Sequence, residues 1–219
     1  ISTGPEGAAA LTTTWPTGLQ RLLMGLVFSL GLILVVVGGA ELFTGNNLIV
    51  MAWANRKVST GRLLRNWGIV YAGNFVGAVA TAVIMLLTQQ YMASNGAIGS
   101  FALTVANNKT GLAFVPALFS GVMCNALVCL AVWLTLGGHS VTDKILAILF
   151  PITAFVALGG EHSIANWFFL PYGLWLDPGT GLALHDVARN LVAVTAGNIA
   201  GGTLLVAGVY WMAYLRGPH

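Results

Sequence analysis

Long runs of uncharged, mostly apolar residues dominate this chain, and single charged residues or short polar segments separate them. A helix that crosses a bilayer needs about 20 predominantly apolar residues. Repeated segments of about ten residues with alternating polarity, which are typical of transmembrane barrels, do not occur in the sequence. The pattern therefore predicts membrane-spanning helices at roughly 19–43, 67–88, 112–136, 145–170 and 191–215.

The composition supports the same fold class. Of the 219 residues, 57% are hydrophobic and only 7% are charged, whereas about 25% of the residues of a soluble domain are charged. A net charge of +3, spread over single residues, does not form the basic stripe of a nucleic-acid binder. We therefore predict an all-α integral membrane protein that binds a lipid bilayer and no nucleic acid.

Motifs of soluble enzymes are missing from the chain. Gly-x-Gly-x-x-Gly, the P-loop and Gly-x-Ser-x-Gly do not occur. The two cysteines, Cys124 and Cys129, lie five residues apart in one predicted span and lack metal-ligand spacing, so buried reduced thiols are expected. The sequence predicts no enzymatic activity, no metal and no cofactor.

Positive residues are concentrated in alternate connecting segments. One side of the membrane would carry six of them, Arg56, Lys57, Arg62, Arg65, Lys144 and Arg216. The other side would carry Arg21, Lys109 and Arg189. By the positive-inside rule, the side with six positive residues is cytoplasmic.

An internal repeat links the two halves of the chain. GGAELFTGN at 38–46 resembles GGEHSIAN at 159–166, because each has paired glycines, an acid and then an asparagine. A second motif, Gly-Asn-x-x-Gly, occurs at 73–77 and again at 197–201. The motifs follow one another at similar spacing in both halves. We therefore predict two related units, at about 15–90 and about 110–216, within one channel domain over 1–219.

Units with an odd number of membrane helices repeat with inverted topology. In such proteins the functional site lies near the midplane, where helices break, so the two Gly-Gly-acid segments are predicted breaks. The second unit begins with the span at 112–136. Its counterpart would lie before Ile1, so we expect an upstream first helix that is absent from this chain and six helices in the bundle.

Five segments together resemble the formate/nitrite transporter family, and most closely its bacterial formate channels. They are GGAELFTGN, CNALVCLAVWL, SVTDK, GGEHSIANWFFLP and GNIAGGTLLVAGVYWMAYLR. The resemblance implies an aquaporin-like bundle of two inverted three-helix repeats with broken helices. It also implies a homopentamer in the bacterial inner membrane with one pore per protomer, which transports formate or a similar small monovalent acid anion, passively or coupled to protons.

His162 is the one histidine well inside a predicted span. An ionisable group at this depth marks a transport pathway by default, and imidazole exchanges a proton near neutral pH. Moving a bare ion into a low-dielectric pore has an idealised cost on the order of 20 kcal/mol, which protonation of the ion would largely remove. We predict that His162 lies at the centre of the pathway; a purely structural histidine is the alternative.

The resemblance implies that Thr44 faces His162 at the pore centre and that Asn125 lines the pore. From the residues alone, Thr44 could instead bond the carbonyls of its own helix. Asn125 could equally serve helix packing, since an amide inside an uncharged span needs partners.

Other polar residues are predicted to support the breaks. Glu41 and Glu161 precede the restarted half-helices, where unpaired backbone N–H groups favour a carboxylate. Asn166 belongs to the second break motif. The resemblance implies that Asn198 bonds to the break region, although a packing role is equally open from the sequence.

The resemblance also assigns two apolar constrictions. The outer one would be formed by Phe28 and Phe155, and the inner one by Leu32, Leu42 and Phe43. On composition alone these are ordinary lipid-facing or core residues, whereas apolar rings in a pore exclude hydrated ions by dewetting. Lys109 is expected in an outer loop of some twenty residues, either as a solvated charge or at a vestibule where it attracts anions.

Three other functions are alternatives to formate transport. A nitrite or hydrosulfide channel of the same family would use the same pore chemistry. A neutral-solute channel of the water or glycerol type would typically carry two Asn-Pro-Ala motifs, which are absent. A membrane anchor of a redox enzyme would need paired histidines within the spans to hold haem.

Overall fold

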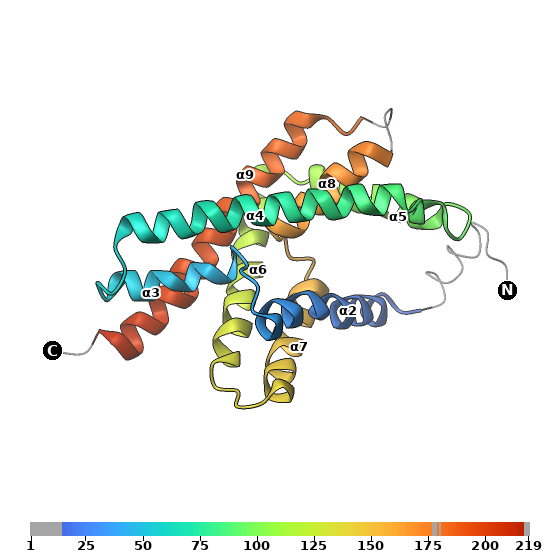
Figure 1. Ribbon diagram of the computed structural model, residues 1–219. Helices are drawn as coiled ribbons and strands as arrows, with labels where there is room; N and C mark the ends of the chain where they lie inside the picture. The colour runs from blue at the N-terminus through green and yellow to red at the C-terminus, as the bar shows by residue number, and fades with distance from the viewer. Residues whose placement is uncertain (1–14, 177–178, 180, 217–219) are drawn as a thin grey trace.

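The computed structural model describes residues 15–176, 179 and 181–216, and the regular elements within these residues are all helical (Figure 1). In chain order they are α2 (Thr17–Gly38), η1 (Gly45–Leu48), α3 (Ile49–Ala54), α4 (Thr60–Leu87), η2 (Gln90–Met92), α5 (Ala97–Thr110), α6 (Phe114–Thr135), α7 (Val141–Ala157), α8 (Ser163–Leu176), α9 (Leu184–Ala200), η3 (Gly201–Gly208) and η4 (Trp211–Leu215). The last two are π-helical and continue from α9.

The helices agree with a membrane bundle. Within the described residues, four helices are long and apolar enough to cross a membrane, namely α2, α4, α6 and the continuous helix Leu184–Leu215. The fourth predicted span, at 145–170, is divided into α7 and α8. The expected all-α membrane fold with broken helices is therefore confirmed.

Both breaks begin at a glycine in the left-handed region. Gly39 follows α2 with φ 75° and Gly159 follows α7 with φ 72°. A residue with a Cβ atom rarely adopts this conformation, whereas glycine does so at no steric cost. The chain resumes as η1 at Gly45 after the first break and as α8 at Ser163 after the second. The Gly-Gly-acid motifs thus mark the breaks correctly.

Helix α6 crosses α9 and lies beside α7 (Figure 1). Glycines make the α6–α9 contact possible. A Cβ atom added at Gly197 would lie 2.1 Å from the Leu118 carbonyl oxygen, and one added at Gly201 would lie 2.1 Å from that of Val122. The two glycines of the Gly-Asn-x-x-Gly motif at 197–201 therefore allow α9 to approach α6 closely. Asn198, between them, is buried in the bundle.

One expectation about local structure is wrong. Lys109 does not lie in a loop, because the segment before α6 folds into α5 and places Lys109 in its last turn. Small residues allow this packing: Ala106 of α5 lies so close to α8 that a Cβ atom at Gly173 would be 2.5 Å from its side chain. This segment is less apolar than the spans, so periodicity and hydropathy alone did not predict the helix.

Candidate functional site

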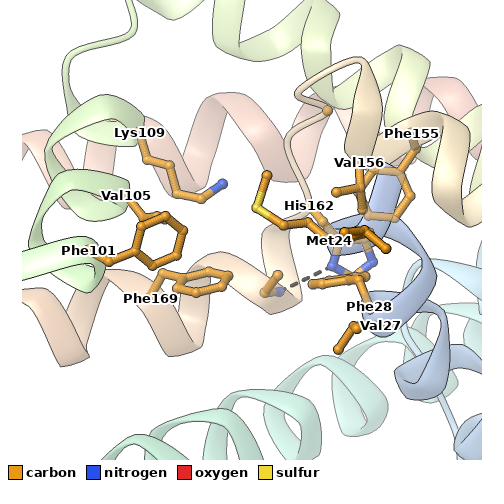
Figure 2. Close-up of a pocket in the computed structure, with 13 residues that line it drawn as sticks. Met24, Val27, Phe28, Phe101, Val105, Lys109, Phe155, Val156, His162 and Phe169 are labelled. Atoms are coloured by element: carbon orange, nitrogen blue, oxygen red, sulfur yellow. Dashed lines mark hydrogen bonds between the residues drawn. The ribbon is translucent and has the colours of Figure 1, made fainter. Parts of the chain in front are cut away.

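Two adjoining cavities lie along the broken helices. The outer cavity, of about 520 Å³, is shown in Figure 2, where Lys109 and Phe169 face His162 and Phe28 across the space. The inner cavity, of about 210 Å³, continues past Leu32 and Leu42. The linings of both are almost entirely apolar. We call them the outer and inner cavities because Lys109 belongs to the side predicted to be external.

Phe28 of α2 and Phe155 of α7 line both cavities. Their rings form an edge-to-face pair with centroids 5.4 Å apart, which is a favourable aromatic geometry. His162 also lines both cavities and lies 6.2 Å from the Phe155 ring. The two phenyl rings and the imidazole therefore lie at the boundary between the cavities.

Both ring nitrogens of the His162 imidazole make hydrogen bonds. The Ala165 backbone N–H donates to Nδ1 at 3.1 Å, which is the hydrogen bond drawn in Figure 2. Because Nδ1 accepts this bond, the neutral ring carries its hydrogen on Nε2. Nε2 lies 2.9 Å from the Thr44 hydroxyl oxygen, so His162 donates to Thr44. The Thr44 hydroxyl hydrogen is not used in this bond.

Thr44 lies at the end of the first break and is fully buried. It meets His162 from a position 118 residues earlier in the chain. Neither Thr44 nor Asn125 is among the residues that line the two cavities. The Asn125 amide instead donates to the Thr44 carbonyl at 3.2 Å and to the Asn198 carbonyl at 2.6 Å. Asn125 thus ties the first break to α9.

Asn198 of α9 bridges the backbone on either side of His162, where the second break ends. Its side-chain oxygen accepts from the Ser163 backbone N–H at 2.8 Å, and its Nδ2 donates to the Glu161 carbonyl at 2.9 Å. Nδ2 also donates to the Gly121 carbonyl of α6 at 2.9 Å. One amide therefore satisfies backbone groups that the broken helix leaves unpaired.

The Glu161 carboxylate carries a second set of contacts. Lys109 Nζ lies 2.9 Å from Oε1, and the Asn166 amide donates to Oε2 at 2.7 Å. Asn166 also donates to Asn190 at 2.7 Å, and Asn190 donates to the Lys109 carbonyl at 2.8 Å. The side chains of Lys109 and Glu161 are only 14% and 6% exposed. Lys109 is therefore a paired, largely buried cation and not a solvated loop charge.

The first break carries the same pattern of amides. Asn74 of α4 accepts from the Phe43 backbone N–H at 2.9 Å and donates to the Glu41 carbonyl at 3.0 Å. Asn46 donates to the Glu41 carboxylate and, at 2.9 Å, to Asn66. Each contact has a counterpart in the second break.

Asn46 of the first break motif was not among the predicted site residues, and neither were three amides outside the break motifs, Asn66, Asn74 and Asn190. A signal for them exists in the sequence, because RNWGIVYAGN at 65–74 aligns with RNLVAVTAGN at 189–198. Comparing the two halves over ten residues, and not only over the Gly-Asn-x-x-Gly motif, would have identified all three.

Phe43 does not share the inner cavity with Leu32 and Leu42. It is buried against Tyr71, with ring centroids 4.7 Å apart, and lines a separate hollow between α4 and α9. Tyr71 in turn bonds the Thr195 hydroxyl at 2.9 Å. Of the five residues assigned to constrictions, four line the two cavities and Phe43 lines the separate hollow.

No cluster of three metal-ligating side chains was found within the described part of the chain.

Comparisons with known proteins agree with this architecture. The family model described as "Formate/nitrite transporter" matches residues 1–212. The formate channel FocA of Escherichia coli strain K12 is 42% identical over 222 residues, which cover 94% of this chain and 78% of that protein. A probable formate transporter of Methanothermobacter thermautotrophicus is 39% identical over 216 residues, covering 92% and 78%.

A solved structure, titled "Pentameric formate channel with formate bound", has the same fold. It superimposes with a TM-score of 0.84 at 41% sequence identity, covering 92% of this chain and 86% of that one. These relatives are channels and transporters, which confirms the expectation that the chain is not an enzyme.

Proposed function

Because the chain belongs to the formate/nitrite transporter family, we propose that it carries formate across the bacterial inner membrane. Each protomer of a homopentamer would contain its own pore, formed by the outer and inner cavities. The pentamer and the substrate are proposed by similarity to the solved formate channel. Positive residues concentrated on one side support the orientation with the inner cavity toward the cytoplasm.

One observation carries the proposal: two apolar cavities meet at His162, whose imidazole lines both and is hydrogen-bonded to the buried Thr44 behind it. An apolar passage opposes hydrated ions, so a small anion needs its charge compensated there. In the outer cavity, the Lys109 ammonium provides positive potential and lies 5.8 Å from the Phe169 ring centre. Glu161 already neutralises Lys109 in part, so an anion would be attracted without being trapped.

At the boundary, His162 donates its Nε2–H to Thr44, so the ring exchanges this bond for one to the carboxylate when an anion lies beside it. While Nδ1 accepts the hydrogen bond from the Ala165 N–H, the imidazole is neutral. A second ring proton must displace that bond. Protonation of His162 is therefore favoured only when an anion lies beside the ring and compensates the new charge. Passive movement uses the neutral ring, and proton-coupled movement uses the transient imidazolium.

The test is transport by the full-length protein in proteoliposomes. We expect formate uptake that saturates weakly and accelerates when the external pH is lowered against a fixed internal pH. Nitrite and hydrosulfide are measured in parallel, since faster flux of either would reassign the physiological anion. Conductance of glycerol or water without formate uptake would contradict the proposal.

A further inference from the structure

The backbone carbonyl of Thr44 has an unusual number of donors. Asn47 Nδ2 lies 3.1 Å from the oxygen, Asn125 Nδ2 lies 3.2 Å away, and the Cys129 thiol donates at 3.3 Å. A carbonyl oxygen has two lone pairs, so three side-chain donors exceed its number of lone pairs. The peptide group that follows Thr44 is therefore fixed in orientation.

These donors come from separate parts of the fold and are buried. Asn47 lies in η1, whereas Asn125 and Cys129 lie on α6 about one helical turn apart; all three side chains are fully buried. They converge at Gly202 of η3. A Cβ atom there would lie 2.6 Å from Asn125 Nδ2, 2.8 Å from Asn47 Cβ and 2.9 Å from Cys129 Sγ. Only a glycine lets the three approach the carbonyl together.

We propose that Cys129 is a positioning residue: by fixing the Thr44 carbonyl, it directs the Thr44 hydroxyl toward His162. The missing side chain of Gly202 leaves room for the Cys129 thiol. This inference rests on the proposed function. The mechanism is geometric: the carbonyl and the side chain of Thr44 leave the same Cα atom, so fixing one restricts the other. Thr44 lies at the N-terminal end of the short helix η1, where the chain has only just resumed helical structure after the break.

The thiol suits the position because of its reach. A sulfur donor bonds at 3.3 Å, whereas a hydroxyl donor prefers about 2.7–2.8 Å. Cys129→Ser therefore keeps a donor but must shift toward the carbonyl, and Cys129→Ala removes the donor altogether. Cys124, which is equally buried on the same helix, has no hydrogen bond to Thr44 and provides the matched control.

The experiment is a double-mutant cycle in the full-length protein. Formate flux is measured in proteoliposomes for Cys129→Ala, Cys129→Ser and Cys124→Ala, each with Thr44 intact and with Thr44→Val. Size-exclusion profiles establish that each variant is assembled. A pair that acts through one group shows non-additive effects, whereas independent residues add.

With Thr44 intact, we expect Cys129→Ala to reduce flux about threefold, since one hydrogen bond typically changes an equilibrium by a factor of about two to ten. Cys129→Ser should recover part of the loss, and Cys124→Ala should change flux by less than about 1.5-fold. In the Thr44→Val background, Cys129→Ala should have no further effect. An undiminished loss in that background, or an equal loss in Cys124→Ala, would overturn the inference.

A spectroscopic readout separates this inference from the proposed function. If the wild-type protein moves no formate, the proposed function fails, and the ¹⁵N NMR signal of His162 Nε2 then tests the positioning role alone. Cys129→Ala should shift that signal as its hydrogen bond to Thr44 loosens, while Cys124→Ala should leave it in place. An unchanged signal in Cys129→Ala would refute the role of the thiol.

Discussion

The two breaks share a scaffold but not their chemistry. In each, an asparagine from a neighbouring helix, Asn74 or Asn198, bridges the backbone on either side of the residue after the acid. That residue is Leu42 in the first break and His162 in the second. The repeated amides therefore maintain the broken backbone, and we propose that the residues that differ between the halves provide the pore with its function.

The two acids differ in the same way. Glu161 is 4% exposed and pairs with Lys109, whereas Glu41 is exposed and bonds Asn46. A buried carboxylate needs a counter-charge, and α5 supplies it. The second break thus carries the buried charges of the site. Three predictions test this contrast, and a capping site away from both breaks serves as a reference.

The largest effect is expected from the ion pair. Lys109→Gln leaves Glu161 buried without a counter-charge, which costs about 3–5 kcal/mol of stability. Thermal unfolding in detergent measures the loss. Lys109→Gln combined with Glu161→Gln should restore most of the stability while formate flux stays low. Equal flux in the double variant and the wild type would show that the cation has no part in attracting the anion.

The bridging amides should differ in importance although their contacts match. Asn198→Ala leaves two fully buried backbone groups of the second break without their partner, so we expect a loss of about 3 kcal/mol. Asn74 is only half-buried and bridges two groups, so Asn74→Ala should cost about 1 kcal/mol. Denaturant unfolding of both variants compares them. Equal losses would mean that burial does not distinguish the breaks.

Substitution of His162 tests the difference in chemistry. His162→Phe should keep the bundle assembled but reduce proton-coupled formate uptake about 100-fold, within the usual contribution of a positioned proton donor. His162→Asn can donate a hydrogen bond but cannot exchange a proton. It should retain passive formate movement and lose the acceleration at low external pH. Unchanged pH dependence in both variants would make the histidine structural.

The smallest effect is expected away from both breaks, at the start of α7. Ser140 caps this helix in a capping box with Asp143, so Ser140→Ala should lower stability by about 1 kcal/mol without changing flux. The hydrogen bonds with Ser140, followed by the His139 N–H, hold the pKa of Asp143 below its usual value. A depressed pKa stabilises the fold above the unfolded pKa of about 3.9.

That stabilisation is therefore lost as the pH falls through the folded pKa of Asp143. The free energies of unfolding of the wild type and Asp143→Asn are measured between about pH 6 and pH 3. They should differ at the higher pH and become equal at the lower pH. A constant difference over this range would exclude the capping carboxylate as its source.

Much of the architecture could be predicted because it is encoded locally. Uninterrupted apolar runs determine which segments enter a membrane, and paired glycines before an acid determine where a helix must break, as at Gly39 and Gly159. The repeat is visible for the same reason, since both halves break a helix at paired glycines that precede an acid. The site residues His162 and Lys109 stood out because charge is rare in this chain.

The tertiary structure decided what these residues contact. It folded α5 and thereby paired Lys109 with Glu161, 52 residues apart. It placed Phe43 beside the cavities and brought the thiol of Cys129 to the Thr44 carbonyl. Such contacts depend on how closely helices approach, which small residues such as Gly202 control and which no local pattern specifies. The sequence by itself determined the membrane fold and its breaks, and packing alone determined the geometry around Thr44 and His162.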